Sequence, residues 1–346
     1  MDRRLFIHYG LASPLVVAAD RASAQPSAPA RTPRILMITF RGQTDAERGF
    51  RSYLANAGIK ADIMERDCNS DVAAVSAILD EAVSFKPDLI YTWGTPVTLA
   101  VTGTFDAPKT HALASVPVVF VLVSAPVRSK IVQSLADQGR NVTGAIHVVP
   151  TDVQMRAMQS YKPFKKIGVL YTSTEQNSKV IVSEVFDFAK KAGIEVIERT
   201  FARDSAGKPL ADGVEGLITE IKRDGAEWLY LLPDTFLGSL YKRVSPSALD
   251  NKLATFGAAE LAVRSGGALV GLVSRYLSVG QLAGAKAFDI LVGGKQASAI
   301  PIETLKRFSL IVNMGTAKAL GGVYPPIDML NYAEVINVPK QGGAAS

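Results

Sequence analysis

The chain has 346 residues, of which 48% are hydrophobic and 20% charged, and its formal net charge is +6 at neutral pH. This length suits two domains better than one, and the composition is that of an ordinary globular protein with sizeable cores. The positive charge is spread along the chain, with no Lys/Arg cluster interleaved with aromatic residues, which argues against nucleic-acid binding. The single cysteine, Cys68, excludes an internal disulfide and any multi-cysteine metal site.

Residues 1–24 are predicted to be an export signal. Arg3 and Arg4 give a charged start, a mostly apolar stretch follows, and residues 22–24 form a small-residue cleavage site near Ala24. The paired arginines also fit a twin-arginine signal, so the general secretory (Sec) and twin-arginine routes are both open. Cleavage would leave a Pro/Ala/Ser-rich linker at residues 25–33, and the expected location is the periplasm.

A structural unit then begins that occurs twice in the chain. Residues 34–40 form an apolar run of the length and composition typical of a buried strand. Thr44 and Glu47 have the spacing of a capping box, in which two side chains cover free amides at the start of a helix. Gly58 is predicted to end that helix, immediately before the next strand.

The second copy of this unit spans residues 165–197. Its first strand is predicted at residues 167–171, Ser173 and Gln176 have the spacing of a second capping box, and Gly193 closes the helix. The tripeptide Ala-Gly-Ile stands at the same juncture in both copies. The repeat predicts two similar α/β halves, each of which points a helix N-terminus at the loop after its first strand.

Strands and helices alternate through both halves, which predicts an α/β fold with parallel sheets covered on both faces. We expect an N-terminal lobe made of residues 34–146, which regains about 275–303. The C-terminal lobe would comprise residues 147–274 and about 304–335, and residues 336–346 would form a tail.

Candidate ligand-binding residues lie at the carboxyl ends of the predicted strands, because ligands of parallel α/β sheets bind there. They are mainly hydroxyls, amides, small residues and aromatics, which suits hydrogen-bonded capture of a small, partly apolar molecule and lacks the means to break bonds. The candidates of the first half are Phe40, Arg41, Gln43, Thr44, Trp93, Gly94, Thr95, Ser124 and Ala125. Those of the second half are Tyr171, Ser173, Thr174, Glu175, Asn177, Ser178, Asp234, Thr235 and Gly257.

Several of these candidates have a purely structural alternative. Trp93 and Tyr171 end predicted strands, so each could stack on a ligand or belong to a core. Arg41 could clamp a carboxylate with two parallel hydrogen bonds, or lie in a solvated loop. Asp234 could receive a ligand amine, or cap a helix N-terminus.

The sequence lacks the motifs of common enzyme classes. There is no G-x-x-x-x-G-K-[ST], no G-x-G-x-x-G after the first strand and no G-x-S-x-G. Outside the signal, His111 and His147 are the conventional bases, and neither has a neighbouring carboxylate and nucleophile. His147 is expected to serve surface or hinge packing. No metal, cofactor or catalytic activity is expected, since no His/Asp/Glu cluster has ligand spacing.

Several stretches resemble the ABC-transporter substrate-binding proteins of the tryptophan/tyrosine-type uptake family. They are residues 141–144 (NVTG), 165–171 (KKIGVLY), 175–178 (EQNS), 118–120 (VVF) before 124–126 (SAP), 290–291 with 294–295 and 300–301, and Asn313 with 317–321 (AKALG). The similarity spans about residues 34–321. In relatives the turn after the strand near residue 120 usually carries an Asp before the Pro; Ala125 stands there in this chain, which removes a polar contact or cap.

This resemblance implies a type I periplasmic-binding-protein fold: two Rossmann-like lobes with parallel sheets, joined by three crossovers and closing on a solute in the cleft between them. It also implies a membrane permease and an ATPase, both on separate chains, as partners. The leading hypothesis is therefore an exported, monomeric protein that captures an amino-acid-like solute or small carboxylate for a permease. The alternative is a ligand-sensing subunit of an exported signalling complex, which could use the same two-lobed body.

Overall fold

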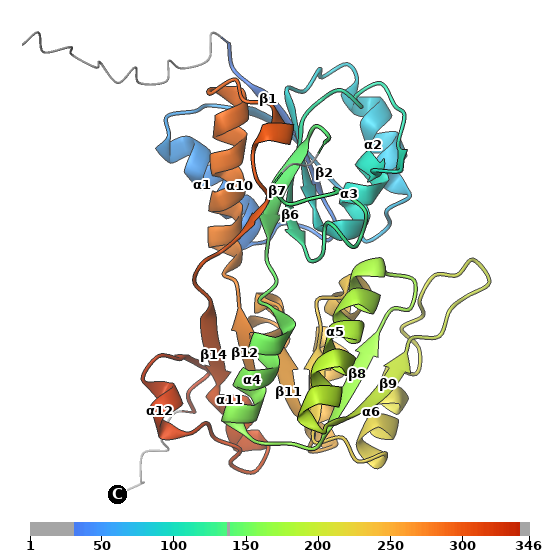
Figure 1. Ribbon diagram of the computed structural model, residues 1–346, viewed down its shortest axis with the longest axis vertical. Helices are drawn as coiled ribbons and strands as arrows, with labels where there is room; N and C mark the ends of the chain where they lie inside the picture. The colour runs from blue at the N-terminus through green and yellow to red at the C-terminus, as the bar shows by residue number, and fades with distance from the viewer. Residues whose placement is uncertain (1–30, 137–138, 340–346) are drawn as a thin grey trace, which may run out of the picture.

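The computed structural model describes residues 31–136 and 139–339. The predicted signal, residues 1–24, lies outside the described residues, as do most of the predicted linker and the end of the predicted tail. The described chain forms two α/β lobes, one above the other in Figure 1, connected by extended segments.

The N-terminal lobe contains a six-stranded sheet in the order β13-β7-β6-β3-β1-β2, and all of its pairings are parallel. Its strands are β1 (Arg34–Thr39), β2 (Asp62–Asp67), β3 (Leu89–Trp93), β6 (Val118–Val123), β7 (Val142–Ile146) and β13 (Glu303–Thr304). Its helices are α1 (Asp45–Asn56), α2 (Ala74–Ala82), α3 (Gly94–Thr102) and α10 (Tyr276–Leu291). Helices α1 and α10 cover one face of the sheet, and α2 and α3 cover the other (Figure 1). Two short strands, β4 (Gly103–Thr104) and β5 (Ala107–Pro108), pair separately.

The C-terminal lobe contains a seven-stranded sheet in the order β15-β14-β12-β11-β10-β8-β9. Its strands are β8 (Lys166–Tyr171), β9 (Glu195–Thr200), β10 (Trp228–Leu231), β11 (Ala254–Gly257), β12 (Val270–Val273), β14 (Ser309–Asn313) and β15 (Glu334–Ile336). Its helices are α4 (Thr151–Tyr161), α5 (Gln176–Ala192), α6 (Val214–Arg223), α7 (Thr235–Ser239), α8 (Tyr241–Asp250), α9 (Glu260–Arg264), α11 (Met314–Ala319) and α12 (Ile327–Leu330). A short 3-10 turn, η1 (Ala297–Ala299), precedes β13.

The described chain crosses between the lobes three times: after β7, after β12 and after β13. Strand β14 is antiparallel to β12. This direction follows from the chain path, because β14 enters the second lobe from the first lobe and runs away from it. The other neighbouring strands of this sheet pair in parallel.

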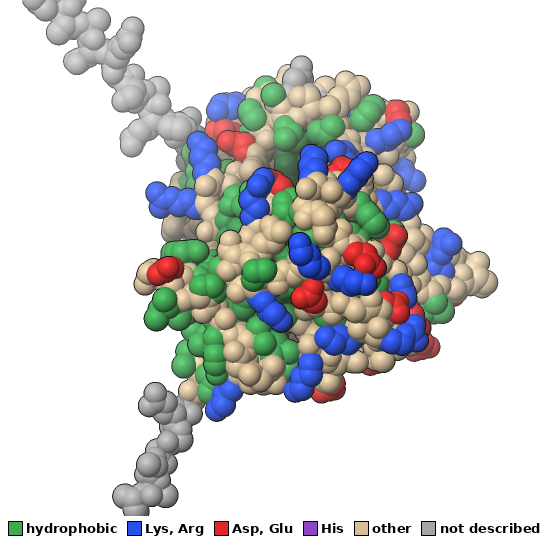
Figure 2. Space-filling model, turned by 60° about the horizontal axis from the view of Figure 1, so that its bottom comes forward, with side chains coloured by type: hydrophobic (Ala, Val, Ile, Leu, Met, Phe, Trp, Pro, Cys, Tyr) green, Lys and Arg blue, Asp and Glu red, His purple; other side chains and the backbone are tan. Residues whose placement is uncertain are grey.

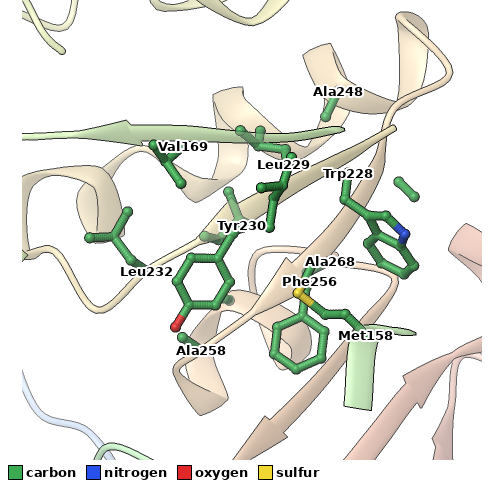
Figure 3. Close-up of a cluster of buried hydrophobic side chains, with 14 of the residues drawn as sticks. Met158, Val169, Trp228, Leu229, Tyr230, Leu232, Ala248, Phe256, Ala258 and Ala268 are labelled. Atoms are coloured by element: carbon green, nitrogen blue, oxygen red, sulfur yellow. The ribbon is translucent and has the colours of Figure 1, made fainter. Parts of the chain in front are cut away.

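Each lobe has its own hydrophobic core. In the second lobe, the Trp228 ring meets Tyr161 edge-on at 5.8 Å between ring centroids, and its Nε1 donates to the Lys162 carbonyl at 3.2 Å. Tyr230 stacks on Phe256 at 6.1 Å between centroids (Figure 3). Aromatic pairs of this kind stabilise a core beyond the area that they bury. On the face shown in Figure 2, Lys and Arg side chains are scattered among acidic and uncharged ones.

The first predicted capping box is confirmed, and the second is wrong. Thr44 caps α1, and the Glu47 carboxylate accepts from the Thr44 amide at 2.7 Å. Helix α5, in contrast, begins only at Gln176, so that residue cannot be the third residue of a helix capped by Ser173. The residue before α5 is Glu175, and its carboxylate bonds to another helix, as described below.

Helices α1 and α10 cross with almost no space between their backbones. A Cβ atom added at Gly280 would lie far inside contact distance of the Ala46 carbonyl, and one at Gly49 would collide with the Leu277 carbonyl. Glycine is therefore required for this approach. The crossing attaches a helix from late in the chain to the first lobe.

Candidate functional site

The carboxyl ends of most strands of both sheets point toward the opposite lobe (Figure 1). Side chains of both lobes line hollows at this boundary, which is called the interlobe cleft. A cavity of about 30 Å³, here called the inner cavity, lies where the lobes meet. Its walls come from the first lobe, the crossovers and the second lobe. They are Arg41, Trp93, Ser124, His147, Asn177, Pro233, Asp234, Thr235, Tyr241, Ala259 and Tyr276.

Two larger hollows flank the inner cavity. One, of about 380 Å³, is called the aromatic pocket, and it is lined by Phe40, Ser70, Asp71, Val72, Pro96, Thr172, Thr174, Glu175, Lys208, Pro209, Thr235, Phe236 and Ser239. The other, of about 770 Å³, is called the polar groove, and it is lined by Arg41, Gln43, Thr44, Asp45, Ser70, Gly238, Ser239, Tyr241, Lys242, Glu260, Leu261, Arg264, Ser265, Gly266 and Tyr276. The polar groove shares three of its residues with the inner cavity, and the aromatic pocket shares one.

Trp93 and Arg41 place an aromatic ring and a cation together in the cleft. Trp93, at the end of β3, is only 5% exposed, and it stacks against Phe40 with 6.2 Å between ring centroids. The Arg41 guanidinium carbon lies 5.1 Å from the centroid of the Trp93 ring, a cation–π contact. Arg41 is thereby held over the ring rather than extended into solvent.

Arg41 and Lys208 each contact the opposite lobe across the cleft. Arg41 donates from Nη1 to the carbonyl of Thr235 in the second lobe at 3.1 Å. The guanidinium fits because Gly238 has no side chain; a Cβ there would lie 2.6 Å from Arg41 Nη1. Lys208 of the second lobe approaches Asp71 of the first to 3.5 Å. The lobes are therefore closed upon each other.

His147 lies in the first crossover, immediately after β7. It is 5% exposed, and its ring meets that of Tyr276 edge-on at 6.0 Å between centroids. Burial lowers the pKa of His147 to about 4, with Arg41 acting in the same direction and a hydrogen bond to the Val123 carbonyl opposing them. The imidazole is therefore neutral at neutral pH.

Asp234 organises the second-lobe wall of the cleft. Its carboxylate is 3% exposed and caps α7 by accepting from the Leu237 amide at 2.8 Å. It also accepts from the Thr172 amide at 2.7 Å, the Thr172 hydroxyl at 3.0 Å and the Ser178 hydroxyl at 2.7 Å. The helix-capping alternative for Asp234 is thus confirmed, and contact with a ligand amine stays a prediction.

Glu175 joins the start of α5 to the start of α7. Its carboxylate accepts from the amide of Thr235 at 3.0 Å and from that of Phe236 at 3.3 Å. Burial raises the pKa of Glu175, and the nearby Asp234 carboxylate raises it further. This arrangement fixes α7, whose residues line all three hollows.

The structure brings only part of the predicted set together. The inner cavity is lined by Arg41, Trp93, Ser124, Asn177, Asp234 and Thr235. The flanking hollows add Phe40, Gln43, Thr44, Thr174 and Glu175. None of the three hollows is lined by Gly94, Thr95, Ala125, Tyr171, Ser173, Ser178 or Gly257. Tyr171 lies in the second-lobe core, where its hydroxyl donates to Glu198 on the neighbouring strand.

Sequence reasoning missed Tyr241 and Tyr276 and did not assign His147 to the cleft. Tyr241 begins α8, away from any strand end, and no local signal marks it. Tyr276 follows the end of β12 by three residues, so extending the search to that strand end would have found it.

The described residues contain neither a cluster of metal-binding side chains nor a membrane-spanning helix. Across residues 31–136 and 139–339, no group of three or more His, Cys, Asp or Glu residues could hold a metal ion. Over the same residues, no helix is long and apolar enough to cross a membrane.

Two lobes with parallel sheets, closing on hollows lined from both sides, define a type I periplasmic-binding-protein fold. Residues 35–335 match the family described as ABC transporter substrate binding protein, and the chain belongs to this family. It is therefore a binding protein and not an enzyme. The chain is 31% identical over 280 residues to a tyrosine-binding protein of Clostridioides difficile, a match that covers 80% of this chain and 76% of that protein. The predicted family and fold are confirmed.

Solved structures agree with this assignment. A conserved domain protein from Vibrio cholerae is 25% identical, with a TM-score of 0.77 and coverage of 88% of this chain and 99% of that one. An ABC domain from Streptococcus pneumonia in complex with L-Trp is 23% identical, with a TM-score of 0.75 and coverage of 88% and 100%. A substrate-binding protein with adhesive properties from Clostridium difficile, in its ligand-free, open structure, is 28% identical, with a TM-score of 0.64 and coverage of 88% and 99%.

Proposed function

We propose that this protein binds an aromatic amino acid between its lobes and delivers it to the permease of an ABC importer. The observation that carries the proposal is the position of Arg41. Its guanidinium lies among the aromatic side chains of Trp93, Tyr241 and Tyr276, and within the described chain it has no carboxylate partner. A cation surrounded by aromatic rings suits a solute with one carboxylate and one ring.

Each part of such a solute has a partner in the cleft. The carboxylate would replace the Thr235 carbonyl as the acceptor for Arg41, forming two parallel, charge-assisted hydrogen bonds. The ring would pack against the aromatic walls. The ammonium group would meet the carboxylates of the second-lobe wall, Asp234 and Glu175.

The inner cavity alone is too small for a whole amino acid, because about 30 Å³ holds only one or two water molecules. Binding therefore requires the Arg41 side chain to leave the face of Trp93, which would join the inner cavity to the polar groove. The two hollows already share Arg41, Tyr241 and Tyr276.

The tyrosine-binding relative supports the solute class, and family membership supports a role in an ABC importer. Export to the periplasm rests on the charged, then apolar, start of the sequence at residues 1–24. The solute would favour the closed form by its greater affinity for that form, and the permease would recognise that closed form.

Calorimetric titration of the full chain with tyrosine, tryptophan and phenylalanine tests the solute class. A solute present at a hundred times its Kd should stabilise the folded protein by about 2.7 kcal/mol, seen as a rise in Tm. Arg41→Gln should weaken binding at least about tenfold, because a hydrogen bond to a charged group is lost. Arg156→Gln, which removes an exposed arginine of α4 that lines none of the three hollows, is the matched control.

Absence of heat and of a Tm shift with all three amino acids would overturn the proposal. Co-purification with a permease tests delivery separately. If the solute binds but no permease is captured, the alternative of a sensing subunit is favoured.

A further inference from the structure

The aromatic pocket has apolar walls on both lobes. Its apolar lining residues are Phe40, Val72 and Pro96 of the first lobe and Pro209 and Phe236 of the second. The pocket therefore exists only while the lobes lie together, and a molecule inside it contacts both of them. Its volume of about 380 Å³ is in the range of pockets that hold small organic ligands.

Each of the two phenylalanines is supported by a second aromatic ring of its own lobe. Phe40 is 8% exposed and lies nearly parallel to Trp93, with 13° between the ring planes and 6.2 Å between the ring centroids. Phe236 is partly exposed and meets Phe201 edge-on, at 4.9 Å between the ring centroids. The supporting rings restrict how far each phenylalanine can move, so both walls are largely preformed for a flat apolar group.

The three charged residues that line the aromatic pocket do not compete with a ring. Asp71 and Lys208 form the ion pair between the lobes, so their charges offset each other. The third, Glu175, accepts from the amides of Thr235 and Phe236 and is a proposed partner of the ammonium group of the solute. The pocket thus provides one place for the ammonium group and, beside it, apolar walls for a ring.

Thr235 connects the aromatic pocket to the proposed carboxylate site. It lines both the aromatic pocket and the inner cavity, and its carbonyl accepts from Arg41. A carboxylate that replaced this carbonyl would therefore lie where the two hollows adjoin. Since only a short link separates the carboxylate of an aromatic amino acid from its ring, the ring can reach the aromatic pocket from there.

We infer that the aromatic pocket is the subsite for the ring of the solute, which it holds between Phe40 of the first lobe and Phe236 of the second. The polar groove is the other hollow large enough for a ring, and Tyr241 and Tyr276 are its aromatic walls. Beside these rings its lining is mainly polar or charged, and the charged residues are Arg41, Asp45, Lys242, Glu260 and Arg264. Such a lining favours charged groups and water over an apolar ring.

This inference rests on the proposed binding of an aromatic amino acid, and it adds the place of the ring and the two residues that contact it. Because those residues belong to different lobes, the ring would bind the closed form more tightly than the open one and so favour closure. Aromatic pairs contribute beyond the area that they bury, and a flat ring fits between two rings better than a saturated, thicker one. We therefore expect phenylalanine to bind about three- to tenfold more tightly than cyclohexylalanine, its analogue with a saturated ring.

The test is calorimetric titration of the full chain with phenylalanine and cyclohexylalanine, repeated on Phe40→Leu and Phe236→Leu. Each variant keeps an apolar side chain and removes one aromatic wall. The preference for phenylalanine should fall in each variant and approach unity when both substitutions are combined. Phe186→Leu, which removes an exposed phenylalanine of α5 that lines none of the three hollows, should keep the wild-type preference.

Equal affinities of the wild-type chain for the two compounds, or an unchanged preference in the folded variants, would overturn the ring subsite and leave the proposed function intact. A preference that is lost in Tyr276→Leu but kept in Phe40→Leu and Phe236→Leu would place the ring in the polar groove and overturn it too. Binding of none of phenylalanine, tyrosine and tryptophan would overturn both proposals. If one variant fails to fold, shown by loss of its melting transition, the wild-type comparison and the other variant still decide.

Discussion

His147 and Glu175 lie on opposite walls of the cleft, and burial shifts their pKa values in opposite directions. The pKa of His147 falls to about 4, and that of Glu175 rises. In both residues the low dielectric of the closed cleft favours the neutral form. The cleft thus presents a neutral imidazole at the first crossover and, on the second lobe, a carboxyl group that is protonated more easily than usual.

The shift at His147 predicts a specific dependence of stability on pH. Its ordinary pKa is 6.5, so between pH 6.5 and 4 the unfolded chain binds a proton that the folded chain does not. The free energy of unfolding should therefore fall as the pH falls through this range, by about 3 kcal/mol in total. Above pH 6.5 His147 contributes no further change.

Denaturant titrations of wild-type protein and His147→Gln between pH 4 and 7 measure this effect. The difference between the two proteins is the informative quantity, because the raised pKa of Glu175 gives an opposite slope, with stability lost as the pH rises. Parallel curves for wild type and variant would contradict a buried, neutral imidazole.

Single residues also mark the limit of sequence reasoning about the site. The strand-end rule identified Arg41 and Trp93, because their position depends only on where a parallel strand stops. It also selected Tyr171, which ends its strand but turns into the second-lobe core. It missed Tyr241, whose place in the cavity wall depends on how α8 packs. Which way a side chain points at a strand end is decided by tertiary packing that periodicity does not encode.

At the level of elements, the contact between α1 and α10 depends on glycine. Gly280 is buried against the Ala46 carbonyl, and Gly284 against the Tyr53 side chain, where a Cβ would lie 2.7 Å from that of Tyr53. Close contact lets the two helices bury their inner faces, but it leaves no room for even one methyl group.

Gly280→Ala should therefore destabilise the protein by about 1–3 kcal/mol, the usual effect of overpacking a tight core. Gly216→Ala is the matched control. Gly216 also lies inside a helix, α6, but it is exposed and an added Cβ would meet nothing within 4 Å. That control should stabilise the protein by about 0.5–1 kcal/mol, because alanine is the better helix former.

Urea unfolding of both variants checks the prediction. Both substitutions add one methyl group to a helix. Because that group has no room at Gly280 and open space at Gly216, the two effects on the free energy of unfolding should have opposite signs. Stabilisation by both would show that the helices can separate at little cost and that the glycine contact is not required.

The two capping boxes show why similar local sequences gave different elements. Thr44 and Glu47 form the predicted box because α1 starts directly after the loop of β1. The loop after β8 has a similar length, residues 172–175 against 40–44, but Glu175 within it bonds to α7, an element distant in sequence. A capping box is a local pattern, and here a tertiary partner overrode it.

On the scale of the whole molecule, the closed arrangement depends on a small number of contacts across the cleft. The ion pair of Lys208 and Asp71 is exposed, so it contributes little by itself. The bond from Arg41 to the Thr235 carbonyl forms in the partly buried cleft and is reinforced by the contact with Trp93. Arg41 is thus one polar link between the lobes, beside the hydrogen bond that the Tyr276 amide at the start of α10 donates to Glu260 at 2.6 Å.

Arg41→Ala should therefore open the ligand-free protein. Small-angle X-ray scattering would detect this as an increase in the radius of gyration relative to wild type, whereas Arg156→Ala should leave it unchanged. An identical radius for wild type and Arg41→Ala would show that the apolar contacts at the crossovers close the lobes without the arginine.

The overall organisation was the part most accessible from the sequence. The repeated strand–helix unit and its two Ala-Gly-Ile junctures predicted two alike lobes, because each copy encodes its own local elements. The closure of the lobes could not be predicted from the sequence. It depends on a contact between Arg41 of the first lobe and Gly238 of the second, and the local sequence of neither half indicates that contact.

The path of the chain through the crossovers has a consequence for any attempt to take the protein apart. The first lobe includes α10 and β13, which lie beyond residue 274 in the chain. Strands β14 and β15, which follow them, belong to the second lobe. A single cleavage of the backbone, at any position, therefore cannot separate one complete lobe from the other. A protease that cleaves an exposed loop should yield fragments that stay associated in one folded protein.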